Sequence, residues 1–425
     1  MHWKIRVVVS ATALLVARQA LAERVLLHDE QWELFTNGRV GGFLSYMRGD
    51  GFPVITATQT PFGGGIDANT ADQIADPSMP LVQGRLESMR VRSGFLGNIL
   101  AVGVRHRYTE WTTLTAYLEM WSDIESESRR KYLPMPIDVR QGFFQADGPW
   151  GTLTIGRQLT LYSRGAAQID FLYGHQYGLG YPGSIDSNGP AAGHVGTGVI
   201  GPGFAAGMVY ATPSSHGFQL NIGVFDPVQL QGAWPRTKWA RPEGELTYDR
   251  DLGTRGKLHL FTNGIYQRVY QAGQLDSVYA TVYGVGYGAR IEIGPFHLGL
   301  AGHYGQGLGL YYALETTEAA YDEQHRLRKS DGYYAQAQYS PGRFDVNAGV
   351  GISRVLLLPT DGVPDPGTGR RNSIIDYQLG ISGVFVYHFS RTLHGDIEYF
   401  RAQYHWYLGE HQNVNFINTG VTMVW

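Results

Sequence analysis

The sequence predicts an all-β protein whose strands close into a transmembrane antiparallel β-barrel of sixteen strands. Three observations lead to this class. Apolar and polar residues alternate with period two, short and long connections alternate between these runs, and glycine and tyrosine are abundant. The 425 residues include 57 glycines and 27 tyrosines but only 17% charged side chains, which favours turns and aromatic-rich strands over helices or disorder. Cysteine is absent, which excludes disulfide scaffolds, thiolate metal sites and cysteine nucleophiles.

Residues 1–22 have the pattern of a secretory signal peptide. A basic start and the apolar run 7–17 precede Ala-Leu-Ala at 20–22, which is a small-x-small cleavage site. The apolar run is too short to span a bilayer as a helix, and no later window is long enough either. We therefore expect an exported mature chain, residues 23–425, that forms a single barrel domain. An uncleaved N-terminal anchor is the alternative.

The C-terminus shows the strand pattern most clearly. Alternate residues from Ile417 to Trp425 form one largely apolar row, and the residues between them form a more polar row. The same alternation recurs at 113–120, 218–224, 345–353 and 375–382. The polar rows are too polar for the core of a β-sandwich. A barrel with lipid outside and water inside satisfies both rows and leaves no unpaired strand edge in the membrane.

Turn-forming residues divide the chain into sixteen such runs. Tight links such as 147–150 (DGPW) and 294–295 (GP) alternate with long links such as 47–84 and 159–192. The predicted strands are 32–46, 85–108, 111–125, 138–147, 150–158, 193–212, 217–226, 243–251, 256–268, 277–294, 296–306, 332–340, 343–355, 373–389, 392–405 and 414–425. An even number of strands, with short turns at one end and long loops at the other, is typical of outer-membrane barrels.

The segment 143–158 (FFQADGPWGTLTIGRQ) resembles the strand–turn–strand that precedes the constriction loop of Gram-negative general porins. The opening 32–46 (WELFTNGRVGGFLSY), the hairpin-spaced segment 203–227 and the aromatic C-terminus are also similar, although Trp425 stands where the family more usually has Phe. The resemblance implies a homotrimer in the lipid of a Gram-negative outer membrane. Each barrel would be a water-filled channel for small hydrophilic solutes and ions, with its third extracellular loop folded into the lumen.

Carried over by its order in the family, the third loop is 159–192, and we expect the pore constriction there. The expected constriction residues are Arg164, Asp170, Tyr173, His175, Tyr177 and Asp186. The aromatic side chains would pack the loop against the wall, while Asp170 and Asp186 would supply negative charge to the pore.

Arginines of the wall are expected to supply the opposing charge. The expected wall residues are Arg39, Arg105 and Arg107 by strand parity, and Arg140 and Arg157 by resemblance. Strict alternation from Leu153 and Ile155 places Arg157 on the lipid face, so a pore-facing Arg157 requires a bulge at Gly156 or a position above the membrane. An acidic loop facing a basic wall would set a transverse field that orients dipolar solutes.

We expect no cofactor, no metal and no catalytic residue, because no motif groups the candidate residues. The run 178–183 (GLGYPG) matches GxGxxG but lacks a strand–helix unit. The other residues considered are Asp67, Asn69, Asp72 and Asp76 for calcium, His297, His303 and His388 for a metal, and Ser353 with His388 for a hydrolase.

Several alternatives to a general diffusion channel stay open. They are a substrate-specific channel for carboxylates or sugars, an outer-membrane barrel enzyme, and a soluble secreted β-sheet protein. A nucleic-acid partner is not expected, because the formal charge is −3.

Overall fold

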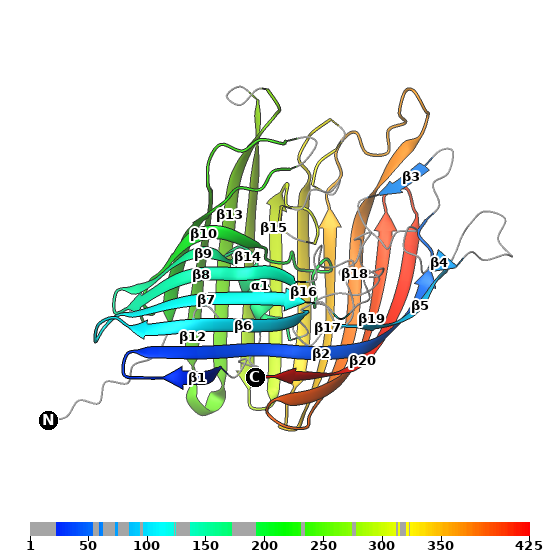
Figure 1. Cartoon of the computed structure of the whole chain (residues 1–425). Coiled ribbons are helices and arrows are strands. Elements are labelled where there is room, and N and C mark those ends of the chain that lie inside the picture. The colour runs from blue at the N-terminus through cyan, green and yellow to red at the C-terminus, as the bar shows by residue number, and fades with distance from the viewer. Residues whose placement is uncertain are drawn as a thin grey trace.

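The chain folds into a closed antiparallel β-barrel of 16 strands, which confirms the predicted fold class (Figure 1). The ring closes where β2 (Trp32–Asp50) pairs with β20 (His411–Val424), from Arg39 opposite Val424 to Gly49 opposite Val414. The computed structural model describes residues 23–53, 59–62, 73–74, 85–93, 97–122, 124, 137–171, 193–230, 234–273, 278–311, 313–314, 320–322 and 324–425.

Consecutive wall strands pair in antiparallel fashion around the ring. β5 (Arg85–Arg92) and β6 (Asn98–Arg107) pair with successive parts of β2 and together form one wall strand, as the predicted run 85–108 implies. The other wall strands are β7 (Thr113–Ser122), β8 (Ile137–Gly148), β9 (Gly151–Leu159), β10 (Phe204–Ala211), β11 (Phe218–Phe225), β12 (Arg241–Asp251), β13 (Lys257–Tyr270), β14 (Tyr279–Ile293), β15 (Phe296–Gln306), β16 (Lys329–Tyr339), β17 (Phe344–Val355), β18 (Arg371–His388) and β19 (Leu393–Trp406).

Three short strands add to the ring without extending it. β1 (Arg24–His28) pairs with the start of β2, and β4 (Gln73–Ile74) pairs with β5. β3 (Gln59–Phe62) pairs in parallel with the start of β18.

The strands present alternate side chains to the two faces of the wall, as the sequence predicts. On β20, Ile417, Val421 and Met423 are 49%, 48% and 52% exposed, whereas Asn418 and Thr422 are buried. The outward row is therefore the apolar one, and the polar row faces the inside of the barrel. This arrangement suits a wall with lipid outside and water inside.

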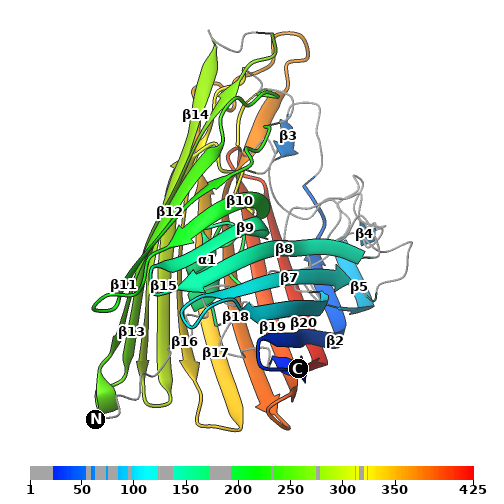
Figure 2. The same cartoon turned by 60° about the vertical axis from the view of Figure 1, so that its left-hand side comes forward.

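The two ends of the barrel differ, and so does the height of its wall. Short turns join the strands at one end, and longer connections join them at the other (Figure 1). The wall is low around β7–β9 and tall around β13 and β14 (Figure 2). Strands β10 and β11 have eight residues each, whereas β14 has fifteen.

One predicted strand is shorter than expected. The run 193–212 was expected to be extended throughout, but β10 begins only at Phe204. Gly193 and Gly196 have φ angles of 68° and 78°, a left-handed conformation that interrupts a strand. Residues 193–203 are therefore free to leave the wall and contact other parts of the barrel.

Helix is scarce in the part of the chain that the structure describes. It contains α1 (Arg164–Ile169) and the single 3₁₀ turn η2 (Gly253–Arg255). Neither helix has the length and apolar character needed to cross a membrane.

Candidate functional site

The segment after β9 crosses the interior and packs on the far wall. Helix α1 contacts β13, β14 and β15 rather than its own neighbours in the ring (Figure 2). Tyr334 on β16 donates a hydrogen bond to the carbonyl of Ala166 at 2.7 Å. Gln336 donates to the carbonyl of Ile169 at 2.7 Å and accepts from the N–H of Phe171 at 3.0 Å. The end of α1 is thereby fixed to the inner face of β16.

The returning segment 193–203 is fixed to the strands that follow. The N–H of Gly198 donates to Ser353 Oγ on β17 at 2.8 Å. Gln378 on β18 donates to the carbonyl of Gly196 at 3.2 Å. The ring of His194 stacks on Tyr334 at a centroid distance of 4.5 Å. Both described limbs of the loop thus lie inside the barrel against β13–β18.

Asp170 was expected to present negative charge to the pore, but it is only 1% exposed. It accepts a hydrogen bond from the N–H of His194 at 2.8 Å, and His194 Nδ1 lies 3.1 Å from the same oxygen. The carboxylate therefore joins the two limbs of the loop instead of lining the channel. Sequence parity gives no warning of this, because the contact lies within a loop.

Arg164 is at the start of α1, where the expected constriction loop lies, and it forms an ion pair with Glu245 of β12. Glu245 belongs to the inward row of β12, together with Glu243 and Arg241. At this point the loop carries the positive charge and the wall carries the negative charge. This order is the reverse of the acidic loop and basic wall that we expected.

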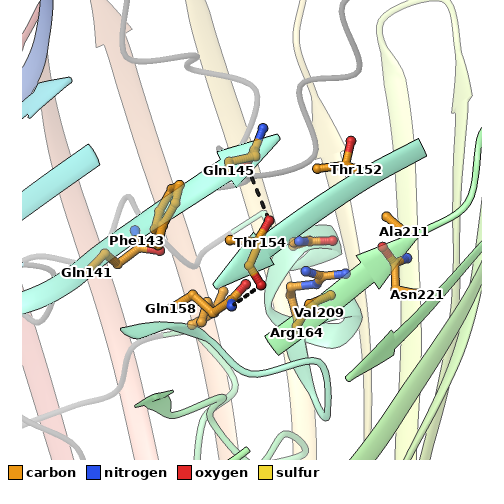
Figure 3. A pocket seen from close by; sticks show the side chains of 12 residues that line it. Gln141, Phe143, Gln145, Thr152, Thr154, Gln158, Arg164, Val209, Ala211 and Asn221 are labelled. Carbon is orange, nitrogen blue, oxygen red and sulfur yellow. Dashed lines mark hydrogen bonds between the residues drawn. The ribbon is translucent and has the colours of Figure 1, made fainter. Parts of the chain in front are cut away.

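An open space lies between α1 and the inner faces of β8–β11 (Figure 3). Its lining consists of Gln141, Phe143, Gln145, Thr152, Thr154, Gln158, Leu159, Arg164, Gln168, Val209, Ala211 and Asn221. Thr154 donates to the side-chain oxygen of Gln145 at 3.5 Å, and Asn221 donates to Glu245 at 3.4 Å. Amides and hydroxyls dominate this lining, in which Arg164 is the only charged residue.

The amide and hydroxyl side chains of this lining were not predicted from the sequence, although strand parity could have identified them. Thr152, Thr154 and Gln158 alternate with Leu153 and Ile155, so they belong to the inward row of β9. Among the strand residues, only charged side chains were predicted to line the pore, so these neutral polar residues were left out.

Arg140 reaches the interior because of a β-bulge. The register between β7 and β8 shifts between Glu119 and Met120, which leaves Arg140 as an extra residue on β8. Its guanidinium pairs with Asp138 at 2.7 Å and lies 5.1 Å from the ring centroid of Trp121. The structure thus places Arg140 inside the barrel, where it contacts other residues of the wall.

Arg157 does not line the lumen in the structure. The pairing of β9 with both neighbours is continuous through Gly156, so the bulge that a pore-facing Arg157 requires is absent there. Arg157 consequently keeps the parity of Leu153 and Ile155 and is exposed on the outward row. Strict alternation is the better guide here than the family resemblance.

Arg39, Arg105 and Arg107 all belong to inward rows, as strand parity indicates. Arg39 is 4% exposed and lies where its charge acts on Asp396 of β19. Arg105 pairs with Glu33 and, at 3.0 Å, with Glu23.

Of the remaining wall and loop residues that we predicted, the structure describes only Arg107. Arg107 is exposed at the short-turn end of β6. Four other expected constriction residues lie outside the described residues: Tyr173, His175, Tyr177 and Asp186. The calcium candidates of the first loop, at 67–76, also lie outside them.

The structure does not assemble a metal or hydrolase site from the histidines considered. Within the described ranges, no group of three or more His, Asp or Glu residues could hold a metal ion. His303 is buried on β15, and His388 pairs with Asp345 at 2.9 Å. Ser353 accepts the hydrogen bond from Gly198 and has no such contact with His388.

Comparison with known proteins agrees with this geometry. The outer-membrane channel DcaP of Acinetobacter baumannii superposes with a TM-score of 0.62 and 11% identity, covering 94% of this chain and 99% of its own. An anion-selective porin from Comamonas acidovorans gives 0.57 and 13%, covering 93% and 100%. OmpF of Salmonella typhi gives 0.52 and 10%, covering 94% and 99%. These likenesses concern the fold.

The sequence comparisons decide the family. No curated protein sequence matches the chain. The family model described as Gram-negative porin matches residues 88–382, which is more than half of the chain. The chain therefore belongs to the Gram-negative porin family and forms an outer-membrane channel through which small solutes diffuse passively.

Proposed function

We propose that this channel favours small cations and neutral hydrophilic solutes over anions. The supporting observation is an excess of carboxylates on the inward rows of the described strands. Most inward arginines have a carboxylate partner, while several further carboxylates have neutral partners or histidine. An aqueous pore lined by an excess of one charge attracts counter-ions of the opposite charge.

The inward arginines are largely neutralised by the wall itself. The ion pairs are Arg105 with Glu33, Arg140 with Asp138, Arg164 with Glu245, Arg241 with Glu243, and Arg290 with Glu292. Each pair leaves little net charge at its position. Ion pairs with little net charge attract anionic solutes only weakly.

The additional carboxylates have no matching arginine among their hydrogen-bond partners in the described part of the barrel. Asp147 on β8 accepts from Gln145 at 2.8 Å and from Thr152 at 2.7 Å, and both donors are neutral. Asp249 on β12 lies 2.7 Å from the ring of His259. Both aspartates lie toward the short-turn end of the lumen, where their negative charge acts on passing ions.

A reversal-potential measurement under a KCl gradient tests this proposal. The wild-type channel should be more permeable to K⁺ than to Cl⁻. Asp147→Asn should lower the permeability ratio by about twofold, and Arg107→Gln should raise it by a similar factor, because a unit charge a few ångströms away in water contributes about 1 kcal/mol or less. Glu110→Gln, an exposed residue in the turn after β6, is the matched control. A wild-type channel that prefers Cl⁻ would refute the proposal.

The amide lining beside α1 supports a second candidate, a channel with a preference for sugars. Gln141, Gln145 and Gln158 can both donate and accept hydrogen bonds, which matches the hydroxyls of a neutral sugar. A sugar that binds there should block the KCl current, and Gln145→Leu should weaken the block. Equal currents with and without a panel of sugars would exclude this candidate.

We also propose that the protein assembles as a homotrimer through the part of its wall that contains the eight-residue strands β10 and β11. Eight-residue strands such as β10 and β11 reach about 26 Å along their axes and, tilted by about 40°, cover about 20 Å of membrane, less than the apolar band of about 25 Å typical of such barrels. Cover by neighbouring copies would relieve this mismatch. OmpT of Vibrio cholerae, which has a similar fold at 12% identity, is described in a trimer form. The mass of the detergent-solubilised protein tests the assembly.

Export through a cleaved signal peptide is a further proposal. It rests on the cleavage pattern at 20–22 and on the position of Glu23, whose carboxylate pairs with Arg105 on the inner wall. We expect the mature protein to begin at Glu23. Intact-mass measurement of protein purified from outer membranes distinguishes this start from an uncleaved chain.

A further inference from the structure

We propose that His405 of β19 and His411 of β20 together bind a divalent transition-metal ion such as Cu²⁺ at the long-loop end of the barrel. The site lies outside the lumen, so the inference is independent of ion selection in the pore. It rests on the cross-strand pairing of the two histidines, on their free ring nitrogens and on the carboxylates beside them.

The two histidines are directly opposite each other at the end of one hairpin. Strands β19 and β20 stand side by side in the wall, and their pairing continues without a register shift up to His405 opposite His411 (Figure 1). The N–H of Trp406 donates to the carbonyl of Glu410 at 2.9 Å, which makes the adjacent histidine pair a non-hydrogen-bonded one. The side chains of such a pair leave the sheet on the same face, with Cβ atoms about 5 Å apart.

The two imidazole rings already face each other. Their centroids are 6.3 Å apart and their planes differ by 29°. On its other side the ring of His405 stacks on Tyr377 of β18, with a centroid distance of 4.4 Å and an interplanar angle of 16°. This stacking restrains His405, so less side-chain entropy is lost when the ring binds an ion. Two nitrogens that bind one ion at about 2.1 Å lie about 3 Å apart, a span within reach of these rings.

The ring nitrogens of both histidines are available to an ion. Neither side chain has a hydrogen bond or an ion pair with any residue that the structure describes. By contrast, His259 and His388 each lie within 3 Å of an aspartate oxygen, at 2.7 and 2.9 Å. His411 is exposed and His405 is half-buried, so dissolved ions reach the pair. Neutral imidazole is the commonest protein ligand for metals and suits copper, nickel and zinc.

Carboxylates near the pair favour a cation. Asp376 is the extra residue where the register of β18 and β19 shifts beside His405, and its charge acts on that ring. Asp50 accepts hydrogen bonds from the backbone and side chain of Asn413, two residues from His411, at 2.9 and 3.2 Å. On these two strands the nearest outward arginine is Arg401, four residues and about 13 Å along the strand from His405. The local potential is therefore negative and attracts positive ions.

The site lies above the lipid-facing band of the barrel. On the outward row of β20 the apolar residues end at Ile417, and Asn415, Asn413 and His411 follow. These six positions cover about 20 Å of strand, or about 15 Å of height after a tilt of about 40°. Water can therefore complete the coordination of an ion that has only two protein ligands, as the tetragonal preference of Cu²⁺ allows. Such a site is smaller than the groups of three or more ligands that are absent from the described ranges.

A Cu²⁺ titration of the detergent-solubilised protein, prepared without a histidine tag, tests the site. The wild type should bind one Cu²⁺ per chain, and its electron paramagnetic resonance spectrum should show coupling to two imidazole nitrogens. His411→Asn should bind the ion about a hundredfold more weakly and show coupling to one nitrogen at most, because linking two ligands strengthens binding by about 10²-fold or more. His405→Asn should behave in the same way.

His216→Asn is the matched control. His216 is an exposed histidine in the turn between β10 and β11, and it has no histidine opposite it. This variant should keep the wild-type affinity for Cu²⁺. Wild-type single-channel conductance of all three variants would show that each barrel is folded.

Three results would overturn the proposal. They are a wild-type spectrum with fewer than two coupled nitrogens, an unchanged Cu²⁺ affinity in His411→Asn, and an equal loss of affinity in His216→Asn. None of these results bears on the permeability ratio of the channel, so the metal site can fail while the proposed ion preference holds.

Discussion

Asp170 and His194 lie 24 positions apart in the sequence, and the carboxylate of one accepts a hydrogen bond from the backbone N–H of the other at 2.8 Å. This contact closes the loop that leaves β9 and returns to β10. Because both residues are buried against β16, the contact fixes the loop to the wall that it faces. The contacts that hold this loop should therefore affect both the stability of the barrel and the current through the channel.

Asp170→Ala should destabilise the barrel without changing its ion preference. The variant leaves the N–H of His194 without its buried acceptor, which costs about 1–3 kcal/mol. The temperature at which the folded band converts to the unfolded band on an SDS gel should therefore fall. The reversal potential should stay at the wild-type value, because the Asp170 carboxylate is held between the two limbs of the loop by His194 and is not among the residues that line the open space beside α1. A large shift in reversal potential at unchanged stability would contradict this placement.

Gln336→Ala should loosen α1 and make the open channel noisier. Gln336 makes two hydrogen bonds at the end of the helix, to Ile169 and Phe171, and no other residue replaces them at those atoms in the described structure. Single-channel recordings should show larger current fluctuations in the open state. Gln338→Ala, two residues along the same strand, is the control. Identical noise in both variants would mean that the two hydrogen bonds of Gln336 do not hold α1 in place.

Gly351→Ala should displace the returning limb of the loop. A Cβ atom at this position would lie 1.9 Å from the carbonyl oxygen of Thr197, so the backbone of the limb must move. Overpacking of this kind costs about 1–3 kcal/mol. At Gly383, on the neighbouring strand β18, the nearest atom to a Cβ is 3.8 Å away, so Gly383→Ala is the matched control. Gel conversion temperatures of the two variants measure the difference.

Two substitutions that break the ion pair between Arg164 and Glu245 should change the K⁺ to Cl⁻ permeability ratio in opposite directions. Arg164→Gln leaves the carboxylate of Glu245 without its cationic partner and should raise the K⁺ to Cl⁻ permeability ratio by about twofold. Glu245→Gln leaves the arginine charge and should lower the ratio. Shifts of the same sign in both variants would contradict the assignment of these charges to the pore.

Acid should weaken the contact between Asp322, in the connection from β15 to β16, and Thr360, in the connection from β17 to β18. Both connections lie at the long-loop end of the barrel. Partial burial raises the pKa of Asp322, but hydrogen bonds from Arg326 and Thr360 outweigh this effect and lower it below its usual value of 3.8. Because the folded-state pKa is lowered, the stabilisation is complete above about pH 5 and is lost as the pH falls below 3.8.

The comparison of Asp322→Asn with the wild type measures this effect. The wild type should convert to the unfolded gel band at a higher temperature than the variant at pH 6, and the difference should shrink as the pH is lowered below 3.8. A difference that persists unchanged at pH 3 would mean that ionisation of Asp322 does not contribute.

The barrel could be predicted from sequence because period-two alternation is a local signal. Ile417, Val421 and Met423 face outward as their parity requires, and the same rule correctly directs Arg39 and Arg105 inward. The rule also places Arg157 outward, whereas its assignment to the pore wall came from resemblance and required a bulge at Gly156 or a position above the membrane. Parity is reliable in strands since each residue's direction is fixed by its neighbours.

The loop inside the barrel could not be predicted in this way. Asp170 and Arg164 were both assigned to the constriction, but only tertiary contacts determine that one is buried by His194 and the other pairs with Glu245. The bulge that turns Arg140 inward likewise depends on the pairing of β7 with β8. Long-range contacts of this kind leave no periodic signature in the sequence.

Single-channel recording in planar lipid bilayers tests the central claim most directly. Purified, folded protein should produce stepwise increases in current in KCl, each step conducting in proportion to voltage, because a closed barrel with a polar interior holds a continuous path of water. If protein that is folded by gel migration inserts into the bilayer and yet passes no current, the interior is sealed and the chain does not act as a diffusion channel.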